Sequence, residues 1–467
     1  MGRGLSCKRI VFDSIAEYTA RRANVGASPD ERVANRRAHG YCLYVRMSPV
    51  HCARPLPHDF PESVPMRFTR SHLALFAAAV FLATSADAQR APRRPALPAA
   101  ADTNDARAYY ELGVRSMARR PELAADAFYW AAELRPGWAE ALYGRHTAML
   151  LRDPRRMIQY QSSGRARSSA EARQIDSLYL RALHSDPFVQ RRFEPELTRM
   201  WVGALIVGGD PTRVDDQTLL SYYTDQVMAD LPPIMRARVK AAQGKLPEAA
   251  QAFGEALRSR RNSSETRGWI LQERARMFAL VGNDERALAD LDSAVNLQVE
   301  RDERELVRFY ESKAVLHHSR GLIFERAGKT DQAREAYSRA LEEDLSYAPA
   351  HLRLGLLALA AGDTASAEGE MRLAAETAPD DATLRILYGT LLSRLRRLDE
   401  AATQLDAATM LAPHHADGWL VLAMVKQLQG DGEAMLRACR EYLARAPRDD
   451  PRRAQVEQLV ATAPEGQ

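Results

Sequence analysis

Few residues in this sequence have the types and spacing that catalysis needs. The stretch AGKT at 327–330 is similar to the end of a phosphate-binding loop. Such a loop also needs a glycine at position 323, where this chain has isoleucine. The stretch falls in a turn between two expected helices, so we expect no nucleotide site there.

Two adjacent histidine pairs are the next candidates, His317-His318 and His414-His415. Neighbouring residues of a helix point about 100° apart, so they rarely bind one metal ion together. The chain has no H-E-x-x-H motif, no cysteine cluster and no G-x-S-x-G motif. We therefore expect no catalytic residue, no metal and no cofactor.

One part of the chain keeps an enzymatic alternative open, because residues 138–230 fit no repeat that we can register. An enzyme, or an accessory module of one, would have its site in this segment. The polar residues that could serve it have no recognisable spacing: His146, His184, Glu194, Glu196, Asp215 and Asp216. A closed pocket with convergent polar groups would favour this alternative over a binding protein.

Residues 66–88 have the three parts of a secretory signal peptide. Arg67 and Arg70 form a basic head, Leu73–Ala83 is an apolar run, and Ala86-Asp87-Ala88 is a cleavage site with Gln89 after it. The run is too short to span a membrane, which takes about 20 residues. No cysteine follows it, which argues against a lipid anchor. We expect an exported protein, in the periplasm or cell envelope of a bacterium.

An internal signal peptide predicts that translation starts at Met66. Residues 1–65 show no sustained helical or strand period, and we interpret them as a mis-called, disordered upstream extension. They carry ten Lys and Arg against six Asp and Glu, so the formal charge of +4 for the whole chain belongs to this extension. The remainder is nearly neutral, and we expect no nucleic-acid partner. Residues 89–105 form a Pro/Ala-rich linker.

Past the signal peptide the chain contains one cysteine, Cys439, so an intramolecular disulfide cannot form. We expect the thiol to be packed in the core. The remaining part exceeds the size of one compact core, which indicates several domains or a repeat array.

A repeat of 34 residues runs through the C-terminal half. Four columns of small residues and prolines keep this step: Gly321, Gly355, Gly389 and Ala423; Ala333, Ala367 and Ala401; Ala340, Ala374 and Ala408; Pro379, Pro413 and Pro447. Within one unit, apolar residues recur three and four apart on both sides of a glycine-containing turn. This pattern predicts two helices whose backbones approach closely at the small residues. Large side chains fill the space between them, in the column of Tyr337, Met371, Leu405 and Cys439.

The period and columns resemble the tetratricopeptide repeat (TPR) family. The resemblance implies an all-α fold, an α-solenoid of antiparallel helix pairs in a right-handed superhelix. It covers 231–447, as about six units, and one further unit at 106–137 with Leu112, Gly113, Ala124 and Pro136. Residues 106–230 would be an N-terminal helical region with degenerate repeats, and 448–467 a capping helix and tail.

In this family the first helix of each repeat lines a concave groove, and the resemblance places a set of side chains there: Arg238, Arg276, His318, Arg326, Leu352, Leu356, Leu359, Ile386, Arg394, Met424 and Leu428. The set changes from basic to apolar along the chain. The expected function is an exported interaction scaffold that binds a protein or peptide segment with apolar anchors and an acidic end. Another copy of the chain would also fit, as self-association.

Overall fold

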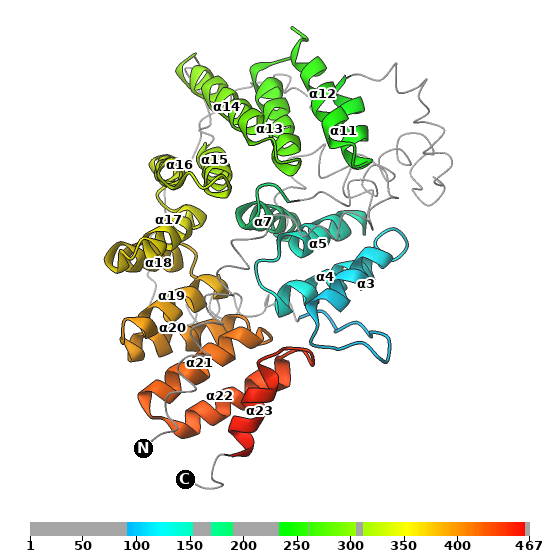
Figure 1. Ribbon diagram of the computed structural model, residues 1–467. Helices are drawn as coiled ribbons and strands as arrows, with labels where there is room; N and C mark the ends of the chain where they lie inside the picture. The colour runs from blue at the N-terminus through cyan, green and yellow to red at the C-terminus, as the bar shows by residue number, and fades with distance from the viewer. Residues whose placement is uncertain (1–90, 153–169, 190–232, 261, 305–311, 463–467) are drawn as a thin grey trace, which may run out of the picture. The chain divides into compact units, whose positions relative to one another are not determined.

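The computed structural model describes residues 91–152, 170–189, 233–260, 262–304 and 312–462 (Figure 1). The predicted upstream extension and signal peptide lie outside these residues. No helix in the described ranges is long and apolar enough to cross a membrane.

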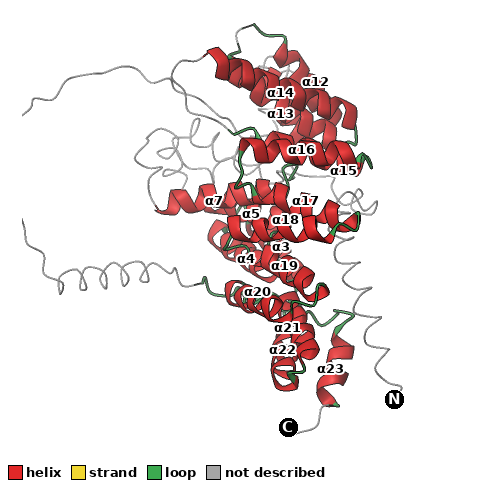
Figure 2. Cartoon of the chain, turned by 90° about the vertical axis from the view of Figure 1, so that its left-hand side faces the viewer, coloured by secondary structure: helices red, strands yellow, loops and turns green. Residues whose placement is uncertain are grey.

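All regular secondary structure in the described part is helical (Figure 2). The N-terminal helices are α3 (Ala106–Ser116), α4 (Pro121–Leu134), α5 (Ala139–Leu151) and α7 (Ala170–Ser185). The next are α11 (Pro233–Ala242), α12 (Leu246–Leu257), α13 (Ser264–Leu280) and α14 (Asp284–Arg304). The regular 34-residue units contain α15 (Ala314–Arg326), α16 (Thr330–Glu343), α17 (Ala348–Ala360), α18 (Thr364–Thr377), α19 (Ala382–Arg394), α20 (Leu398–Leu411), α21 (Ala416–Gln429) and α22 (Gly432–Arg445), and α23 (Arg453–Ala461) follows them.

Consecutive helices pack as pairs, and the second helix of a pair also packs on the first helix of the next. The pairs α15–α16, α17–α18, α19–α20 and α21–α22 coincide with the four 34-residue units. Figure 1 shows the two helices of each pair side by side, joined by a short turn. The all-α fold of paired helices that the sequence predicts is therefore confirmed.

The small-residue column marks the closest approach within each pair. A Cβ atom added to Gly355 would lie 2.9 Å from Met371 Cγ, and one added to Gly389 would lie 2.9 Å from Leu405 Cγ. Gly321 faces the ring of Tyr337 in the same way. The fourth large residue, Cys439, is buried, and burial raises the pKa of its thiol. Small residues on one helix and large ones on the other thus set the contact.

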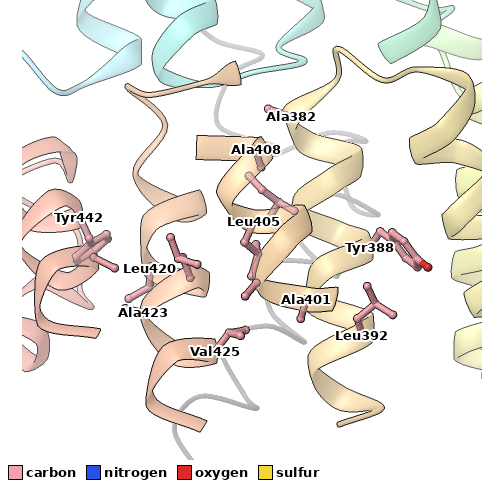
Figure 3. Packing of buried hydrophobic residues seen from close by; sticks show 14 of the residues in the cluster. Ala382, Tyr388, Leu392, Ala401, Leu405, Ala408, Leu420, Ala423, Val425 and Tyr442 are labelled. Carbon is pink, nitrogen blue, oxygen red and sulfur yellow. The ribbon is translucent and has the colours of Figure 1, made fainter. Parts of the chain in front are cut away.

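A single core cluster extends from α18 to α23. Figure 3 shows Leu405 and Leu420 of α20 and α21 in the middle of this cluster, with Tyr442 of α22 on one side and Tyr388 and Leu392 of α19 on the other. Val456 of α23 belongs to this cluster, and Leu459 and Val460 pack against it. The last helix therefore covers apolar surface of the last repeat.

Asp450 stabilises the entry to this last helix. Its carboxylate accepts the N–H of Arg452 at 2.9 Å and is ion-paired with the same guanidinium at 2.6 Å. Arg452 also pairs with Asp417 of α21 at 2.7 Å. The chain after Pro447 is thereby tied to the first helix of the last repeat.

The N-terminal region contains a second helix pair that the sequence pattern does not reveal. Phe128 of α4 lies between Gly113 of α3 and Gly144 of α5, and a Cβ on either glycine would come within 2.7 Å of its ring. Helix α5 pairs with α7. Gly144 follows Gly113 by 31 residues, and a long connection separates α5 from α7. Both departures break the 34-residue register.

Candidate functional site

The residues predicted for the groove all lie in the described ranges, on or beside the first helices of the repeats. They fall into two groups. On α17, α19 and α21, four of them belong to or pack against one apolar cluster: Leu356, Leu359, Ile386 and Met424. Those on α11, α13 and α15 each contact other parts of the chain. We name the surface formed by Leu356, Leu359, Arg394, Met424 and Leu428 the first-helix face.

The apolar part of the first-helix face rests on the C-terminal core. Leu356, Leu359 and Met424 are half-buried and pack against the cluster that contains Ile386. Ile386 itself is buried, and its Cδ1 atom would lie 3.4 Å from a Cβ atom on Gly418 of α21. Ile386, which the sequence placed in the groove, is therefore a buried core residue beneath this surface and is not accessible to a partner. Leu352 packs in a separate cluster with Ala348 and Leu384.

The polar part of the first-helix face is Arg394, at the end of α19. Its side chain is exposed, and in the described part of the chain no carboxylate forms an ion pair with it. The surrounding protein lowers the pKa of its guanidinium, because desolvation disfavours the charged form. Leu428, at the end of α21, is 41% exposed. The last turns of α19 and α21 thus expose a cation, unpaired within the described ranges, and an apolar side chain.

Two of the basic groove residues serve the array itself. The Arg238 guanidinium lies 4.7 Å from the ring centre of Trp269, which joins α11 to α13. Arg326 donates to the carbonyl of Ala279 at 3.2 Å and pairs with Asp284, which joins α15 to the α13–α14 turn. These guanidinium groups already have partners within the array.

The other two, Arg276 and His318, are buried. Arg276 is ion-paired with Glu273 at 2.8 Å, while its Nε atom has no hydrogen-bond partner among the described residues. The Nδ1 atom of His318 lies 3.4 Å from the hydroxyl of Tyr347. Burial lowers the pKa of His318 to about 3, so the ring is neutral.

Residues 184–188, at the end of α7 and just after it, contact the array near its middle. The ring of His184 is 5.2 Å from that of Tyr347, in an edge-to-face arrangement. Phe188 is half-buried and packs against the cluster of α13, α14 and α15 that contains Leu271 and Leu291. Sequence reasoning missed this contact, since no periodicity relates residue 188 to residues 271–291.

A second contact joins the N-terminal region to the last repeat. The ring of Trp130 lies 4.9 Å from that of His414, and the Nδ1 atom of His415 lies 3.2 Å from the carbonyl oxygen of Leu134. Asn104 donates to the carbonyl of Ala444 at 2.9 Å, and Asp102 accepts the N–H of Arg448 at 2.6 Å. The second histidine pair thus has a packing role.

The remaining candidates for chemistry have ordinary surroundings. The AGKT stretch is the turn between α15 and α16, where Gly328 has a φ of 71°. His146 lies 2.9 Å from the carbonyl of Ile175. Among the described residues no group of three metal-ligating side chains occurs. Glu194, Glu196, Asp215 and Asp216 lie outside the described residues.

No family model and no curated protein matches the sequence. Two solved structures are similar over part of the chain. One is YrrB, described as a TPR protein with an unusual peptide-binding site, at 21% identity and a TM-score of 0.35, covering 45% of this chain and 99% of YrrB. The other is MamA from Desulfovibrio magneticus RS-1, at 16% identity and a TM-score of 0.32, covering 38% of this chain and 94% of MamA. The assignment of TPR-like pairs rests on the helices and glycine contacts described above.

Proposed function

We propose that this TPR-like chain is a protein-interaction scaffold that binds a peptide segment on the first-helix face. The observation that carries the proposal is Arg394 on α19, an exposed cation with which no carboxylate of the described residues pairs. The neighbouring first helix α21 carries Met424 and Leu428. A partner segment with apolar anchors would cover the leucine and methionine side chains. A carboxylate of that segment would pair with the guanidinium, which presents several donors in a fixed plane.

Selection of peptides tests this proposal without knowledge of the natural partner. A displayed library of random 12-residue peptides is selected on the full chain. We expect the enriched peptides to combine apolar residues with an acidic residue. Arg394→Gln should weaken the best peptide about 10- to 100-fold, because a charge-assisted hydrogen bond contributes about 1.5–3 kcal/mol.

The matched control is Arg372→Gln on the second helix α18, where the exposed guanidinium pairs with Glu376 at 3.0 Å. This variant should bind the peptide as the wild type does. Leu428→Asp should weaken binding while the circular dichroism spectrum stays unchanged. Failure to enrich any peptide, or equal binding by the Arg394 and Arg372 variants, would rule out this face.

Export is a separate part of the proposal. It is supported by the basic head, apolar run and Ala-Asp-Ala cleavage site at 66–88. The scaffold would then act in the periplasm or cell envelope of a bacterium. N-terminal sequencing of the native protein should give a chain that starts near Gln89. A native chain that retains residues before Met66 would contradict both export by this signal and the upstream-extension interpretation.

A further inference from the structure

We propose that residues 184–188, with the sequence HSDPF, are an intramolecular pseudo-ligand that occupies a second peptide site on α13 and α15. The inference rests on the proposed function, since it assumes that first helices of this array bind peptide segments. It concerns the basic end of the array, which Arg394 and Leu428 do not reach. Three side chains of the segment interact with the array. His184 contacts Tyr347, Phe188 packs against the cluster of α13, α14 and α15, and the charge of Arg276 acts on Asp186.

The aromatic side chain provides the apolar anchor. Phe188 contacts a cluster built from three helices of the array, to which Leu271 and Ala275 of α13, Leu291 of α14 and Leu316 of α15 contribute. The next residue, Val189, is buried in the cluster of the N-terminal helices. The chain therefore places neighbouring side chains into two different cores. Phe188 is the one that belongs to the array.

The acidic side chain of the segment, Asp186, is close enough to Arg276 of α13 for the two charges to interact. Burial raises the pKa of Asp186 to about 6, and the charges of Arg276 and Glu140 act on this carboxyl in opposite directions. Its carboxylate accepts the N–H of Phe188 at 2.8 Å, which fixes the turn between acid and ring. The segment thus holds an acid, which the charge of Arg276 reaches, two positions before the aromatic anchor that packs against α13.

The match between the segment and the site is incomplete. The recorded ion pair of Arg276 is with Glu273, and within the described residues its buried Nε atom donates to nothing. An unsatisfied buried donor costs about 1–3 kcal/mol. A partner segment whose carboxylate reached this atom would recover that free energy, which residues 184–188 leave unused. Such a segment could displace the chain's own residues.

The chemistry of the displacing partner follows from the contact. It is a peptide segment with a carboxylate two residues before an aromatic ring, with a turn between them as in residues 186–188. While residues 184–188 stay bound, they lower the apparent affinity for such a partner, because only the fraction of molecules with a vacated site can bind it. The segment is therefore an autoinhibitory contact at this end of the array.

A synthetic peptide of residues 182–190, ALHSDPFVQ, tests the proposal in fluorescence anisotropy with the full chain. The double variant Asp186→Asn with Phe188→Ala should bind this labelled peptide at least ten-fold more tightly than the wild type does. The matched control peptide, ALHSNPAVQ, should bind neither protein. Equal binding of ALHSDPFVQ to wild type and variant, or none to either, would overturn the proposal and leave a packing contact only.

The single variant Asp186→Asn guards against loss of the fold in the double variant. It removes a carboxylate whose burial is costly, so thermal stability should not fall, and binding of ALHSDPFVQ should rise several-fold. If binding of ALHSDPFVQ does not rise, Asp186 does not help to occupy the site. The library-selected peptide that depends on Arg394 is measured in parallel on the same proteins. If the library-selected peptide binds and ALHSDPFVQ does not, this inference alone is refuted. If ALHSDPFVQ binds and the library-selected peptide does not, only the proposed site on the first-helix face is refuted.

Discussion

The two parts of the repeat array differ in how regular they are and in what covers their first helices. From α15 to α22 the units repeat every 34 residues, and glycine faces a large side chain in three of the four pairs. The earlier pairs have alanine in this column, at Ala237 and Ala275, and spacings of 38 and 46 residues to the next unit. The first helices α19 and α21 of the regular part expose Arg394 and Leu428, whereas Arg276 of the earlier part is buried, as is His318 on the first helix of the regular part.

Apart from Arg326, the exposed side chains of the predicted groove therefore lie on α19 and α21, in the later units of the regular part. No carboxylate of the described residues forms an ion pair with Arg394, and Leu428 is 41% exposed. Longer connections move a helix relative to its neighbours, and Arg326 then reaches Asp284 and the carbonyl of Ala279.

The largest expected effect is between the first two units of the regular part, where Arg353 of α17 pairs with Glu325 of α15. The Nε atom of Arg353 lies 3.0 Å from Glu325 Oε2, which also accepts the hydroxyl of Tyr337 at 2.8 Å. Glu325→Leu leaves a mostly buried guanidinium without its counter-charge. We expect a loss of about 3–5 kcal/mol, measured by denaturant unfolding.

The control for this prediction is Arg372→Ala, which removes an exposed pair between positions four apart. It should change the free energy of unfolding by less than about 0.5 kcal/mol. A loss of similar size in both variants would show that the pair between Arg353 and Glu325 stabilises the chain no more than an exposed pair does.

Two glycines of the same repeat should respond in opposite ways to leucine. Gly355→Leu forces a side chain against Met371 and should destabilise the array by about 1–3 kcal/mol. Gly369→Leu on α18 meets nothing within 4 Å and replaces a poor helix former, so stability should rise slightly. Thermal melting of both variants measures the difference. Unchanged melting of the Gly355 variant would mean that the close approach is wrong.

Removal of residues 447–467 should affect the regular part through its last unit. A chain that ends at Ala446 loses Val456, Leu459 and Val460 from the core cluster, together with the pair between Arg452 and Asp417. We expect a loss of about 2 kcal/mol and aggregation of the exposed surface. The melting temperature measures the loss of stability, and sedimentation velocity detects the aggregation. If the shortened chain is equally stable and soluble, the last helix is not a cap.

Much of the regular part could be predicted from the sequence, because its evidence is local. A glycine column at a fixed step, such as Gly355 and Gly389, requires only that equal units stack equally. Gly144 escaped this reasoning because it follows Gly113 by 31 residues and its helix pairs across a long connection. The placement of Phe188 and the burial of Arg276 depend on tertiary packing between distant segments, which leaves no period in the sequence.

The smallest expected effect concerns a turn inside the regular part. The turns after α15, α17 and α21 each have a glycine with positive φ, whereas the turn after α19 has Arg396 at a φ of 64°. A left-handed conformation costs a residue with a Cβ atom about 1–2 kcal/mol, and glycine avoids this cost but loses more entropy on folding. Arg396→Gly should therefore stabilise the chain by less than about 1 kcal/mol. Gly362→Arg, the reverse exchange at the matching turn, should destabilise it by a similar amount. Melting of the two variants measures the exchange in both directions, and a clear loss of stability in Arg396→Gly would show that the arginine side chain contributes more than its backbone costs.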